Sequence, residues 1–244
     1  MSKINAADHL IVALDFERIE QAKPLVKALD GLVHFFKIGI GLQLEPGVNE
    51  YIRELIADGK KVFLDYKYLD IEETVERAVR QAVKIGVSFI TVHGYSSIIA
   101  AAARARGDSP LKLFSVTVLT SLDATDIHEM GFDCSVEDLV LHRARRTVQW
   151  GCDGVIASGH EAALIREQIG KNLVIITPGI RRDTDERGDQ KRAMSPARAI
   201  EAGADYLVVG RPIIASPDPI KATKEILAEM QAALESRANT VLAS

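Results

Sequence analysis

The sequence predicts an α/β protein folded as a single (β/α)8 barrel, the TIM barrel fold, across residues 1–244. Short runs rich in β-branched residues alternate with longer segments of helical periodicity from one end of the chain to the other. No Pro- or Ser-rich linker and no change of composition divides the chain. A hydrophobic content of 47% in 244 residues can fill one sizeable core. These observations together favour one large domain.

Eight short runs have the composition and length of strands. In chain order the predicted strands are His9–Asp15, Phe35–Gly39, Lys61–Lys67, Phe89–Gly94, Lys112–Thr120, Gly154–Ser158, Leu173–Gly179 and Tyr206–Arg211. Helical periodicity is clear between them over Ile71–Ile85, where Val75, Val79 and Val83 recur at every fourth position, and over Val136–Trp150. Such an alternation of strands and helices, in a chain of this length, matches a (β/α)8 barrel.

A doubly wound α/β sheet is the alternative fold, and the end of the first strand speaks against it. Nucleotide-binding sheets of that kind carry a glycine-rich turn after the first strand, whereas this strand leads into Asp15-Phe16-Glu17. The chain holds neither GxGxxG nor GxxxxGK[ST], and Gly39-Ile40-Gly41 lacks the third glycine of such a turn. We therefore expect a barrel.

Composition excludes several classes of function. The 30 basic and 34 acidic side chains are interspersed and sum to −4, so no basic stripe indicates nucleic acid as a partner. No apolar stretch approaches the roughly 20 residues that span a bilayer. The apolar run Leu10–Leu14 is too short for a signal peptide, which predicts a cytoplasmic protein without membrane contact. Cys134 and Cys152 lack metal or redox spacing, and we expect both to be reduced and structural.

Polar or backbone-exposing residues end nearly every predicted strand. The carboxyl ends of the strands meet at one mouth of a barrel, where active sites are built. These strand-end residues are, in order, Asp15, Lys37, Asp65 with Lys67, His93, Thr120, Ser158, Pro178-Gly179 and Gly210-Arg211. One such residue alone would more often cap a helix or lie on the rim. Their recurrence around a single mouth predicts an active site there.

The densest of these groups is Asp65-Tyr66-Lys67-Tyr68-Leu69-Asp70. Side chains two apart on a strand share a face, so Asp65 and Lys67 are expected to point the same way. One interpretation is structural: an ion pair, with Asp70 as the N-cap of a helix that begins at Ile71. The other is functional: two carboxylates bracket the Lys67 ammonium and keep it protonated, which suits a positioned proton donor. A Schiff-base lysine would need apolar or cationic surroundings instead.

The last predicted strand carries residues suited to phosphate. Gly210 can offer a backbone N–H and Arg211 a forked cation, at the position where many barrels bind phosphate. Residues 181–192 form a long polar stretch with few apolar anchors. This stretch is either a solvated charged loop or a mobile loop that closes over the phosphate. Its place beside Gly210 and Arg211 favours the closing loop.

Several motifs follow one another over nearly the whole chain, from about residue 10 to 214. They are Ala13-Leu14-Asp15, Phe36-Lys37-Ile38-Gly39, Asp65-x-Lys67-x-x-Asp70-Ile71 with Thr74, Val118-Leu119-Thr120-Ser121, Thr177-Pro178-Gly179-Ile180-Arg181, Gly188-Asp189-Gln190 and Val209-Gly210-Arg211-Pro212. Together they closely resemble the bacterial orotidine 5′-phosphate decarboxylases. Leu69, Glu72 and Glu73 depart from the family, which commonly reads Lys-Phe-His-Asp-Ile-Pro-Asn-Thr there, but the charged trio is kept.

The resemblance implies decarboxylation of orotidine 5′-monophosphate to UMP and CO2, in de novo pyrimidine synthesis, with no cofactor and no metal. Lys67 would protonate C6 of the pyrimidine, with Asp65 and Asp70 beside it. It also implies a homodimer with shared active sites, in which Asp70, Ile71 and Thr74 reach over from the partner subunit. The implied substrate-binding residues are Asp15 and Lys37 at the ribose, Thr120 at the pyrimidine edge, Gln190 between phosphate and base, Gly210, Arg211 and Arg181 at the phosphate, and Pro178.

Two alternatives remain open at this point. Related barrel enzymes, such as 3-keto-gulonate 6-phosphate decarboxylase and hexulose-phosphate synthase, share the Asp-x-Lys-x-x-Asp element. In that Mg²⁺-dependent sugar-phosphate branch of decarboxylases and aldolases, a carboxylate of the element would hold the metal. A non-catalytic barrel that only binds a nucleotide would keep Gly210 and Arg211 but would not need Asp65, Lys67 and Asp70.

Overall fold

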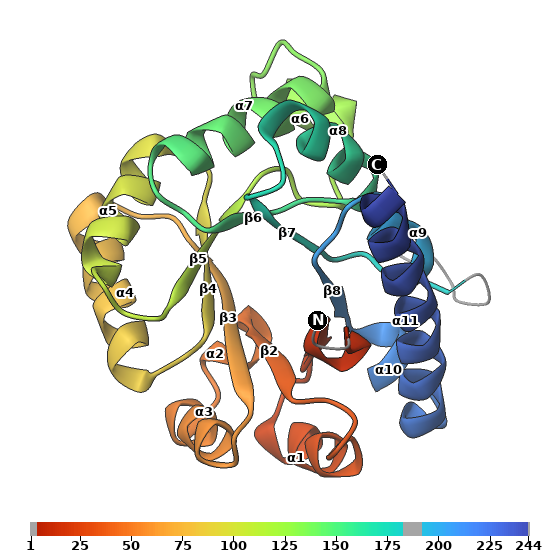
Figure 1. Ribbon diagram of the computed structural model, residues 1–244. Coiled ribbons are helices and arrows are strands. Elements are labelled where there is room, and N and C mark those ends of the chain that lie inside the picture. Colours follow the sequence, from red (N-terminus) through yellow and green to blue (C-terminus); the bar gives the residue numbers. More distant parts are fainter. Residues whose placement is uncertain (1–3, 183–191, 244) are drawn as a thin grey trace.

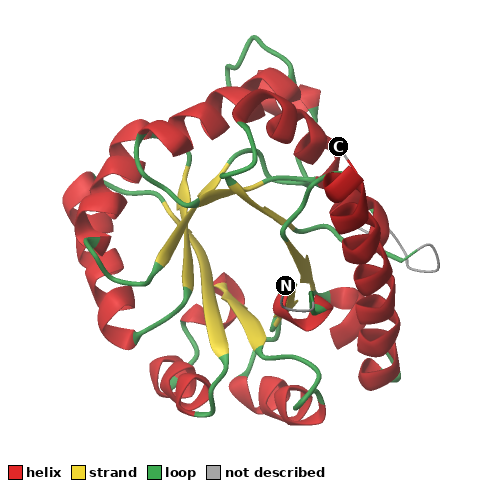
Figure 2. Ribbon diagram, in the orientation of Figure 1, coloured by secondary structure: helices red, strands yellow, loops and turns green. Residues whose placement is uncertain are grey.

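The computed structural model describes residues 4–182 and 192–243, and within them the chain forms a closed barrel of parallel strands (Figures 1 and 2). The strands are hydrogen-bonded in sequence order from β1 to β8, and β8 pairs with β1 to close the ring. Their bounds are β1 Leu10–Ala13, β2 Phe35–Gly39, β3 Lys61–Tyr68, β4 Phe89–His93, β5 Lys112–Val116, β6 Gly154–Ile156, β7 Val174–Thr177 and β8 Tyr206–Val209. The predicted (β/α)8 fold is confirmed.

Each predicted strand is present, but most end earlier than the sequence pattern indicated. β2 has its predicted bounds and β3 is one residue longer than predicted. β5 stops at Val116, whereas the pattern continued to Thr120. Lys37, Asp65 and His93 remain in paired strands, whereas other polar residues of the carboxyl ends, such as Asp15 and Thr120, belong to the loops around the mouth.

Helices surround the barrel as an outer ring (Figure 2). They are α1 Ile19–Ala28, α2 Ile40–Gln43, α3 Val48–Ala57, α4 Glu72–Ile85, α5 Ser96–Arg106, α6 Ala124–Glu129, α7 Val136–Gln149, α8 Gly159–Ile169, α9 Pro196–Glu201, α10 Arg211–Ile214 and α11 Pro219–Ala243, with a short 3-10 helix, η1, at Ala6–Asp8. The two helices predicted over Ile71–Ile85 and Val136–Trp150 are α4 and α7. In the described part of the chain, no helix is long and apolar enough to cross a membrane.

Asp70 does not have the N-cap position at the start of α4 that the structural interpretation gave it. The N-cap of α4 is Ile71, and no side chain caps this helix end. Asp70 comes one residue too early to reach the first free amides of α4. Its carboxylate instead accepts the N–H of Ile71, at 2.7 Å from Oδ1 to N. The N-cap role that the structural interpretation gave to Asp70 is therefore wrong.

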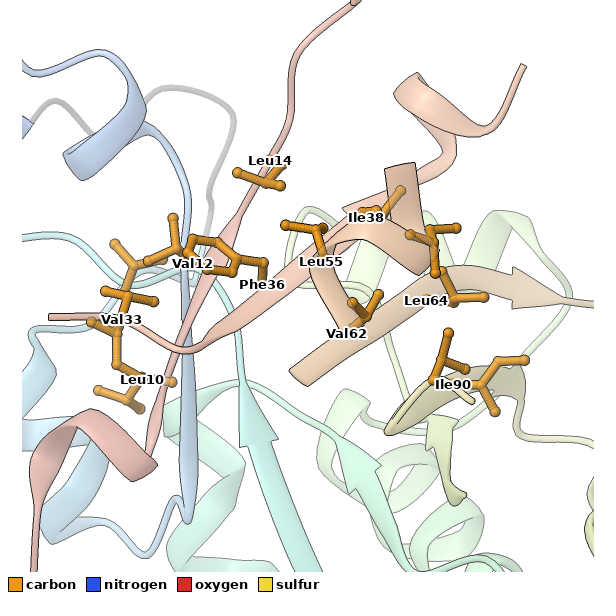
Figure 3. Close-up of a cluster of buried hydrophobic side chains, with 14 of the residues drawn as sticks. Leu10, Val12, Leu14, Val33, Phe36, Ile38, Leu55, Val62, Leu64 and Ile90 are labelled. Atoms are coloured by element: carbon orange, nitrogen blue, oxygen red, sulfur yellow. The ribbon is translucent and has the colours of Figure 1, made fainter. Parts of the chain in front are cut away.

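Alternation along the strands sorts apolar side chains into an outer and an inner layer. The outer layer lies between strands and helices, and Figure 3 shows part of it, including Val12, Phe36, Val62 and Ile90. The inner layer fills the barrel itself, with Ile11, Ala13, Phe35, Phe63, Phe89, Phe114, Ile176 and Val208. Its aromatic rings are closely packed, with 4.6 Å between the centroids of Phe89 and Phe114. The interior of the barrel is thus filled by side chains, and the cavity at the carboxyl ends of the strands lies above this layer.

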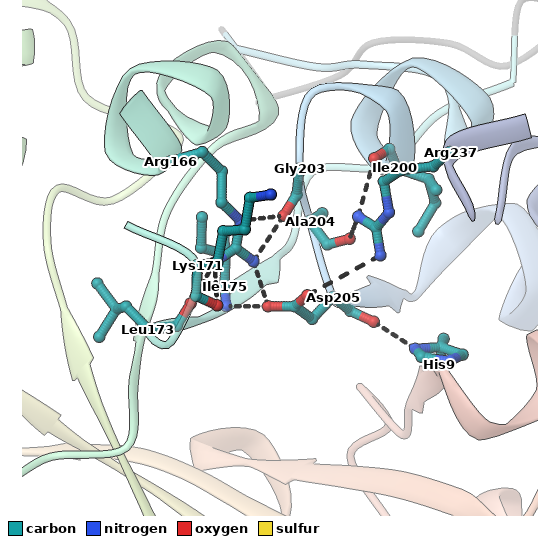
Figure 4. Close-up of polar contacts among 10 residues, drawn as sticks. All are labelled: His9, Arg166, Lys171, Leu173, Ile175, Ile200, Gly203, Ala204, Asp205 and Arg237. Atoms are coloured by element: carbon teal, nitrogen blue, oxygen red, sulfur yellow. Dashed lines mark hydrogen bonds and ion pairs between the residues drawn. The ribbon is translucent and has the colours of Figure 1, made fainter. Parts of the chain in front are cut away.

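The amino end of the barrel is connected by a set of polar residues that we call the amino-end set: His9, Arg166, Asp205 and Arg237 (Figure 4). Asp205, just before β8, accepts the N–H of Ile175 on β7 at 2.8 Å and pairs with the guanidinium of Arg166. Nδ1 of His9, just before β1, donates to the carbonyl of Asp205 at 2.7 Å. These contacts tie β1, β7 and β8 together where the ring closes.

The two arginines of the amino-end set donate mainly to backbone carbonyls. Arg166 reaches the carbonyl of Gly203 through Nε at 3.0 Å and through Nη2 at 2.8 Å. Arg237, from α11, reaches the carbonyl of Ala204 at 2.7 Å. The long C-terminal helix is thereby fixed to the loop that precedes β8.

The loop predicted over 181–192 falls mostly outside the described residues, from 183 to 191. Gln190 lies in that part. The structure does describe Arg181 and Arg182 at one end of the loop and Arg192 at the other.

Candidate active site

A cavity of about 560 Å³ opens at the carboxyl ends of the strands. Its walls come from loops and strand ends all around the ring, as expected for the mouth of such a barrel. Of the predicted site residues, the following line it: Asp15, Lys37, Asp65, Lys67, Thr120, Pro178, Arg181, Gly210 and Arg211. Residues as distant in sequence as Asp15 and Arg211 therefore share one cavity.

The backbone of β3 departs from regular pairing where it enters this cavity. Leu64 pairs with Ile90 of β4, but the next paired residue of β3, Tyr68, faces Val92. Three residues of β3 thus lie opposite a single residue of β4, which is a bulge. Within it Lys67 has φ of 49°, the left-handed region, and is the one non-glycine residue with positive φ in the described chain. The sequence analysis predicted from simple alternation that Asp65 and Lys67 share one face. Both do line the cavity, but the bulge rather than a regular strand places them there.

Four charged side chains, from β2, β3 and the loop after β1, meet in the cavity, and we call them the carboxyl-end set: Asp15, Lys37, Asp65 and Lys67. Nζ of Lys67 lies 2.9 Å from Oδ2 of Asp65. Nζ of Lys37 lies 3.5 Å from the same oxygen and 3.0 Å from Oδ1 of Asp15. The charges alternate along this chain of contacts, so each ammonium has a carboxylate neighbour.

Electrostatics keeps the two most buried members of the set charged. Burial alone would lower the pKa of Lys37, but the carboxylates of Asp65 and Asp15 outweigh it and raise that pKa above its ordinary value. Burial alone would raise the pKa of Asp65, but the ammonium groups of Lys37 and Lys67 and the hydroxyl of Thr91 lower it. Lys37 and Asp65 are therefore ionised at neutral pH.

Two glycines let the backbone pass close to the carboxyl-end set. A Cβ at Gly39 would lie 3.1 Å from Nζ of Lys37, and one at Gly210 would lie 3.2 Å from Oδ2 of Asp15. A side chain at either position would push against a charged group. Gly39 ends β2 and Gly210 precedes α10. At both positions the neighbouring charged side chains leave little room for any residue other than glycine.

The wall of the cavity that follows β7 and β8 is cationic. Gly210 is the N-cap of α10, and Arg211 begins that helix with its side chain exposed to solvent. Arg181, after β7, is buried, and its Nη1 donates to the carbonyl of Ile180 at 2.7 Å. Two guanidinium groups and a backbone amide at one wall form a suitable site for a dianion such as a phosphate.

The remaining walls are partly apolar and suit a flat ring. Val116, Ile156 and Val208 contribute inward-facing side chains from β5, β6 and β8. Thr120, nine-tenths buried, and Pro178 lie in the loops above them. The cavity thus combines an apolar space and a hydroxyl with the carboxyl-end set and the cationic wall.

Three predicted site residues do not line the cavity of this chain. Asp70, Ile71 and Thr74 are all exposed on the rim beyond β3. Within one chain, the β3 carboxylate that pairs with Lys67 is therefore that of Asp65.

Two of the polar strand-end residues also lie elsewhere. Ser158 is buried and caps α8 together with Glu161, which is a structural role. His93 lines a neighbouring apolar pocket of about 230 Å³ with Tyr95 and Arg143. Burial, the charge of Arg143 and the charge of Lys67 lower the pKa of His93.

Two residues around the site were missed by the sequence analysis. The hydroxyl of Thr91, on β4, contacts both Asp65 and Lys67. Arg192 pairs with the buried Glu161, and its Nη2 donates to the carbonyls of Val118 at 3.1 Å and Leu119 at 2.9 Å, just before Thr120. The inward spacing Phe89-Thr91-His93 was a usable signal for Thr91, whereas nothing in the charged stretch singled out Arg192.

Among residues 4–182 and 192–243, no group of three or more His, Cys, Asp or Glu side chains is arranged to hold a metal ion.

Comparison with known proteins identifies the family. The model of the orotidine 5'-phosphate decarboxylase / HUMPS family matches residues 8–226. The chain belongs to this family. The resemblance predicted from the motifs is thereby confirmed, over nearly the same span.

Two bacterial members of the family are similar along almost their full length. A Nitrobacter winogradskyi protein named orotidine 5'-phosphate decarboxylase is 56% identical over 229 residues, covering 94% of this chain and 95% of that protein. One of the same name from Afipia carboxidovorans is 48% identical over 229 residues, covering 94% and 97%. Since both carry the decarboxylase name, the sugar-phosphate alternative is not favoured.

Solved structures of the family share the barrel. The crystal structure of orotidine 5'-phosphate decarboxylase from Lactobacillus acidophilus aligns with a TM-score of 0.78 at 33% identity, covering 91% of this chain and 98% of that chain. The one from Pyrococcus horikoshii OT3 aligns with a TM-score of 0.74 at 24% identity, covering 91% and 99%, and that likeness bears on the fold alone.

Proposed function

We propose that the chain is a cofactor-independent decarboxylase that converts orotidine 5′-monophosphate to UMP and CO2 in de novo pyrimidine synthesis. One observation carries the proposal: a single cavity holds the ion pair of Lys67 with Asp65 at one side and the cationic wall of Arg181 and Arg211 at the other. The substrate has the matching layout, with a reacting carbon at one end and a phosphate at the other. Membership of the family and the names of its close relatives support the same activity.

The chemistry asks for a proton donor held beside C6 of the pyrimidine. The bond between C6 and the carboxylate breaks, CO2 leaves, and the electron pair stays on C6. The Lys67 ammonium stabilises this developing charge and then delivers a proton to C6, after which solvent reprotonates the lysine. Because Oδ2 of Asp65 lies 2.9 Å from Nζ of Lys67, the lysine is held in place before the reaction begins.

Substrate binding follows from the cavity walls. Lys37 and Asp15 are proposed to contact the ribose hydroxyls, and Thr120 with Pro178 to contact the pyrimidine. Gly210, Arg211 and Arg181 are proposed to hold the phosphate, with Gln190, which lies outside the described residues, between phosphate and base. Phosphate binding far from C6 can help to organise the site around the reacting carbon.

The proposal includes a homodimer in which each active site takes residues from both subunits. Asp70, Ile71 and Thr74 are exposed on the rim of the cavity, where a neighbouring chain can reach. Apolar side chains are exposed on the same rim, including Leu44 at 91% and Ile71 at 70%. Exposed apolar patches of this kind mark interaction surfaces. In such a dimer Asp70 of one subunit would supply the second carboxylate beside Lys67 of the other.

Cytoplasmic location belongs to the same proposal. Cys134, which is exposed, and Cys152, which is buried, are both free thiols, as suits a reducing compartment.

Activity is tested by mixing the purified protein with orotidine 5′-monophosphate and following the ultraviolet absorbance as UMP forms. We expect full turnover after exhaustive treatment with EDTA, and none in Lys67→Ala prepared in the same way, which controls for a contaminating host enzyme. Absence of turnover in the wild type would overturn the proposed function. Turnover of a sugar phosphate that returns only with Mg²⁺ would assign the chain to the other branch.

The shared site is tested by mixing two inactive variants. Lys67→Ala and Asp70→Ala homodimers should each be nearly inactive, but a heterodimer contains one site with both defects and one with none. Subunit exchange should therefore restore activity toward half of the wild-type value per heterodimer. Verified heterodimers that stay inactive would place Asp70 within its own chain.

A further inference from the structure

Thr91 occupies the place on β4 where regular pairing with β3 is interrupted. Its neighbours Ile90 and Val92 pair with Leu64 and Tyr68, so Thr91 alone lies opposite the bulge. The side chain is fully buried and follows Phe89 at the inward spacing. It therefore lies in the layer directly beside the carboxyl-end set.

The Thr91 hydroxyl bridges the backbone and the carboxylate of the bulge. The backbone N–H of Lys67 donates to Oγ1 of Thr91 at 2.9 Å. Oγ1 in turn lies 3.0 Å from Oδ1 of Asp65. Since a hydroxyl has one proton and the Lys67 amide is a donor, that proton must go to Asp65.

This bridge gives the two oxygens of the Asp65 carboxylate different partners. Oδ1 is occupied by Thr91, whereas Oδ2 faces the ammonium groups of Lys67 at 2.9 Å and Lys37 at 3.5 Å. Rotation of the carboxylate would break the bond to Thr91. The hydroxyl therefore fixes which oxygen, and which direction, is offered to Lys67.

The bridge also supports an unfavourable backbone. Lys67 has φ of 49°, a left-handed conformation that is unfavourable in a residue with a Cβ. Such a conformation persists only where its surroundings enforce it. The bond from the Lys67 amide to Thr91 replaces the ladder bond that the bulge removes.

From these contacts we infer that Thr91 is a positioning residue for the proton donor: it holds the Lys67 backbone in the left-handed conformation and aims Asp65 at the ammonium. Thr91 does not line the cavity, so it acts through Lys67 and Asp65 rather than on the substrate. This inference rests on the proposed function for its kinetic consequence, but not for the geometry of the bridge.

The kinetic test compares a variant that lacks the Thr91 hydroxyl with one that keeps it. In Thr91→Val, which keeps the shape, we expect kcat for orotidine 5′-monophosphate to fall about 10- to 100-fold with KM within about threefold. Thr91→Ser keeps the hydroxyl and should retain kcat within about threefold. The matched control is Ser115→Ala, because Ser115 is a buried hydroxyl on neighbouring β5 that has no hydrogen-bond partner among the described residues; it should keep wild-type kcat.

A second readout needs no substrate. Hydrogen exchange at the Lys67 amide should be at least tenfold faster in Thr91→Val than in the wild type or Thr91→Ser. If the wild type has no decarboxylase activity, the proposed function fails while this measurement still tests the bridge. Thr91→Ala provides a second deletion of the hydroxyl if the valine variant does not fold.

Several results would overturn the inference. They are a kcat in Thr91→Val within twofold of wild type, an equal loss in Thr91→Ser, and an equal loss in Ser115→Ala. Failure of both Thr91→Val and Thr91→Ala to fold would show that the hydroxyl holds the whole barrel rather than positioning the donor.

Discussion

The carboxyl-end set and the amino-end set lie at opposite ends of one barrel and are built from the same kinds of residue. At the amino end, the guanidinium groups of Arg166 and Arg237 donate largely to backbone carbonyls, and Asp205 accepts a backbone N–H from β7. At the carboxyl end, the ammonium groups of Lys37 and Lys67 pair directly with carboxylates, and all of these groups line an open cavity.

The difference shows that the two sets are distinguished by the groups to which their charged side chains bind. Backbone partners give a structural role, whereas side-chain partners at a cavity leave the charges available for chemistry. The donors of the amino-end set are used to connect strands, loops and the C-terminal helix. The donors of the carboxyl-end set are held by side chains that a substrate can approach. Changes at the two ends should therefore affect different measurements: stability at one end and turnover at the other.

The largest expected effect is on turnover, in Lys67→Ala. We expect kcat to fall at least about 1,000-fold, equivalent to about 4 kcal/mol, because the proton donor is removed. Stability and binding of UMP should change little, since Asp65 keeps Lys37 and Thr91 as partners. Lys112→Ala, at the amino end of β5, is the control. If Lys67→Ala retained more than about a tenth of wild-type kcat, Lys67 would not be the main proton donor, and the catalytic role of the carboxyl-end set would be contradicted.

The next effect is on stability, in Asp205→Ala. Its loss leaves the Arg166 guanidinium and the Ile175 N–H without their carboxylate, so we expect the free energy of unfolding to fall by about 2 kcal/mol. The folded variant should keep wild-type kcat. Urea denaturation measures the loss, with exposed Asp108→Ala as a control expected to stay within about 0.5 kcal/mol. A kcat that falls in parallel would mean that the two ends are not independent.

A smaller effect separates binding from chemistry within the cavity. Arg211→Ala should weaken UMP binding about tenfold, about 1.4 kcal/mol, and leave binding of uridine unchanged, because only UMP carries the phosphate. Calorimetric titration of both ligands measures this, with Arg104→Ala on the outer helices as the control. Equal losses for UMP and uridine would place Arg211 away from the phosphate.

The smallest effect is on the pH dependence of stability. Because the pKa of Asp65 is lowered in the folded protein, its carboxylate stabilises the fold above the ordinary value of 3.8, and this contribution is lost as pH falls through the lower folded value. The free energy of unfolding should therefore fall more between about pH 5 and about pH 3 in the wild type than in Asp65→Asn. Identical pH slopes in urea titrations would contradict a charged Asp65.

The sequence was sufficient for the fold because strand and helix periodicities are local patterns, and for most of the cavity wall because strand ends converge by topology. It was not sufficient for the bulge in β3, since whether a strand carries extra residues depends on its pairing with the partner strand. Thr91 was missed for the same reason: its role exists only opposite that bulge. The start of α4 shows the limit of local rules, because Asp70 has the residue type of an N-cap but stands one position too early.

The aromatic layer in the barrel interior has a consequence for the strength of the charges above it. Phe63, Phe89 and Phe114 pack ring against ring, with centroids 4.6 to 6.3 Å apart, so the space beneath Lys37 and Asp65 is hydrocarbon rather than water. Hydrocarbon screens an electric field far less than water does, and field lines from the buried charges are directed upward into the cavity. A ligand that covers the mouth displaces the last polarisable solvent, and each charge of the site then acts on it through a medium of low dielectric constant.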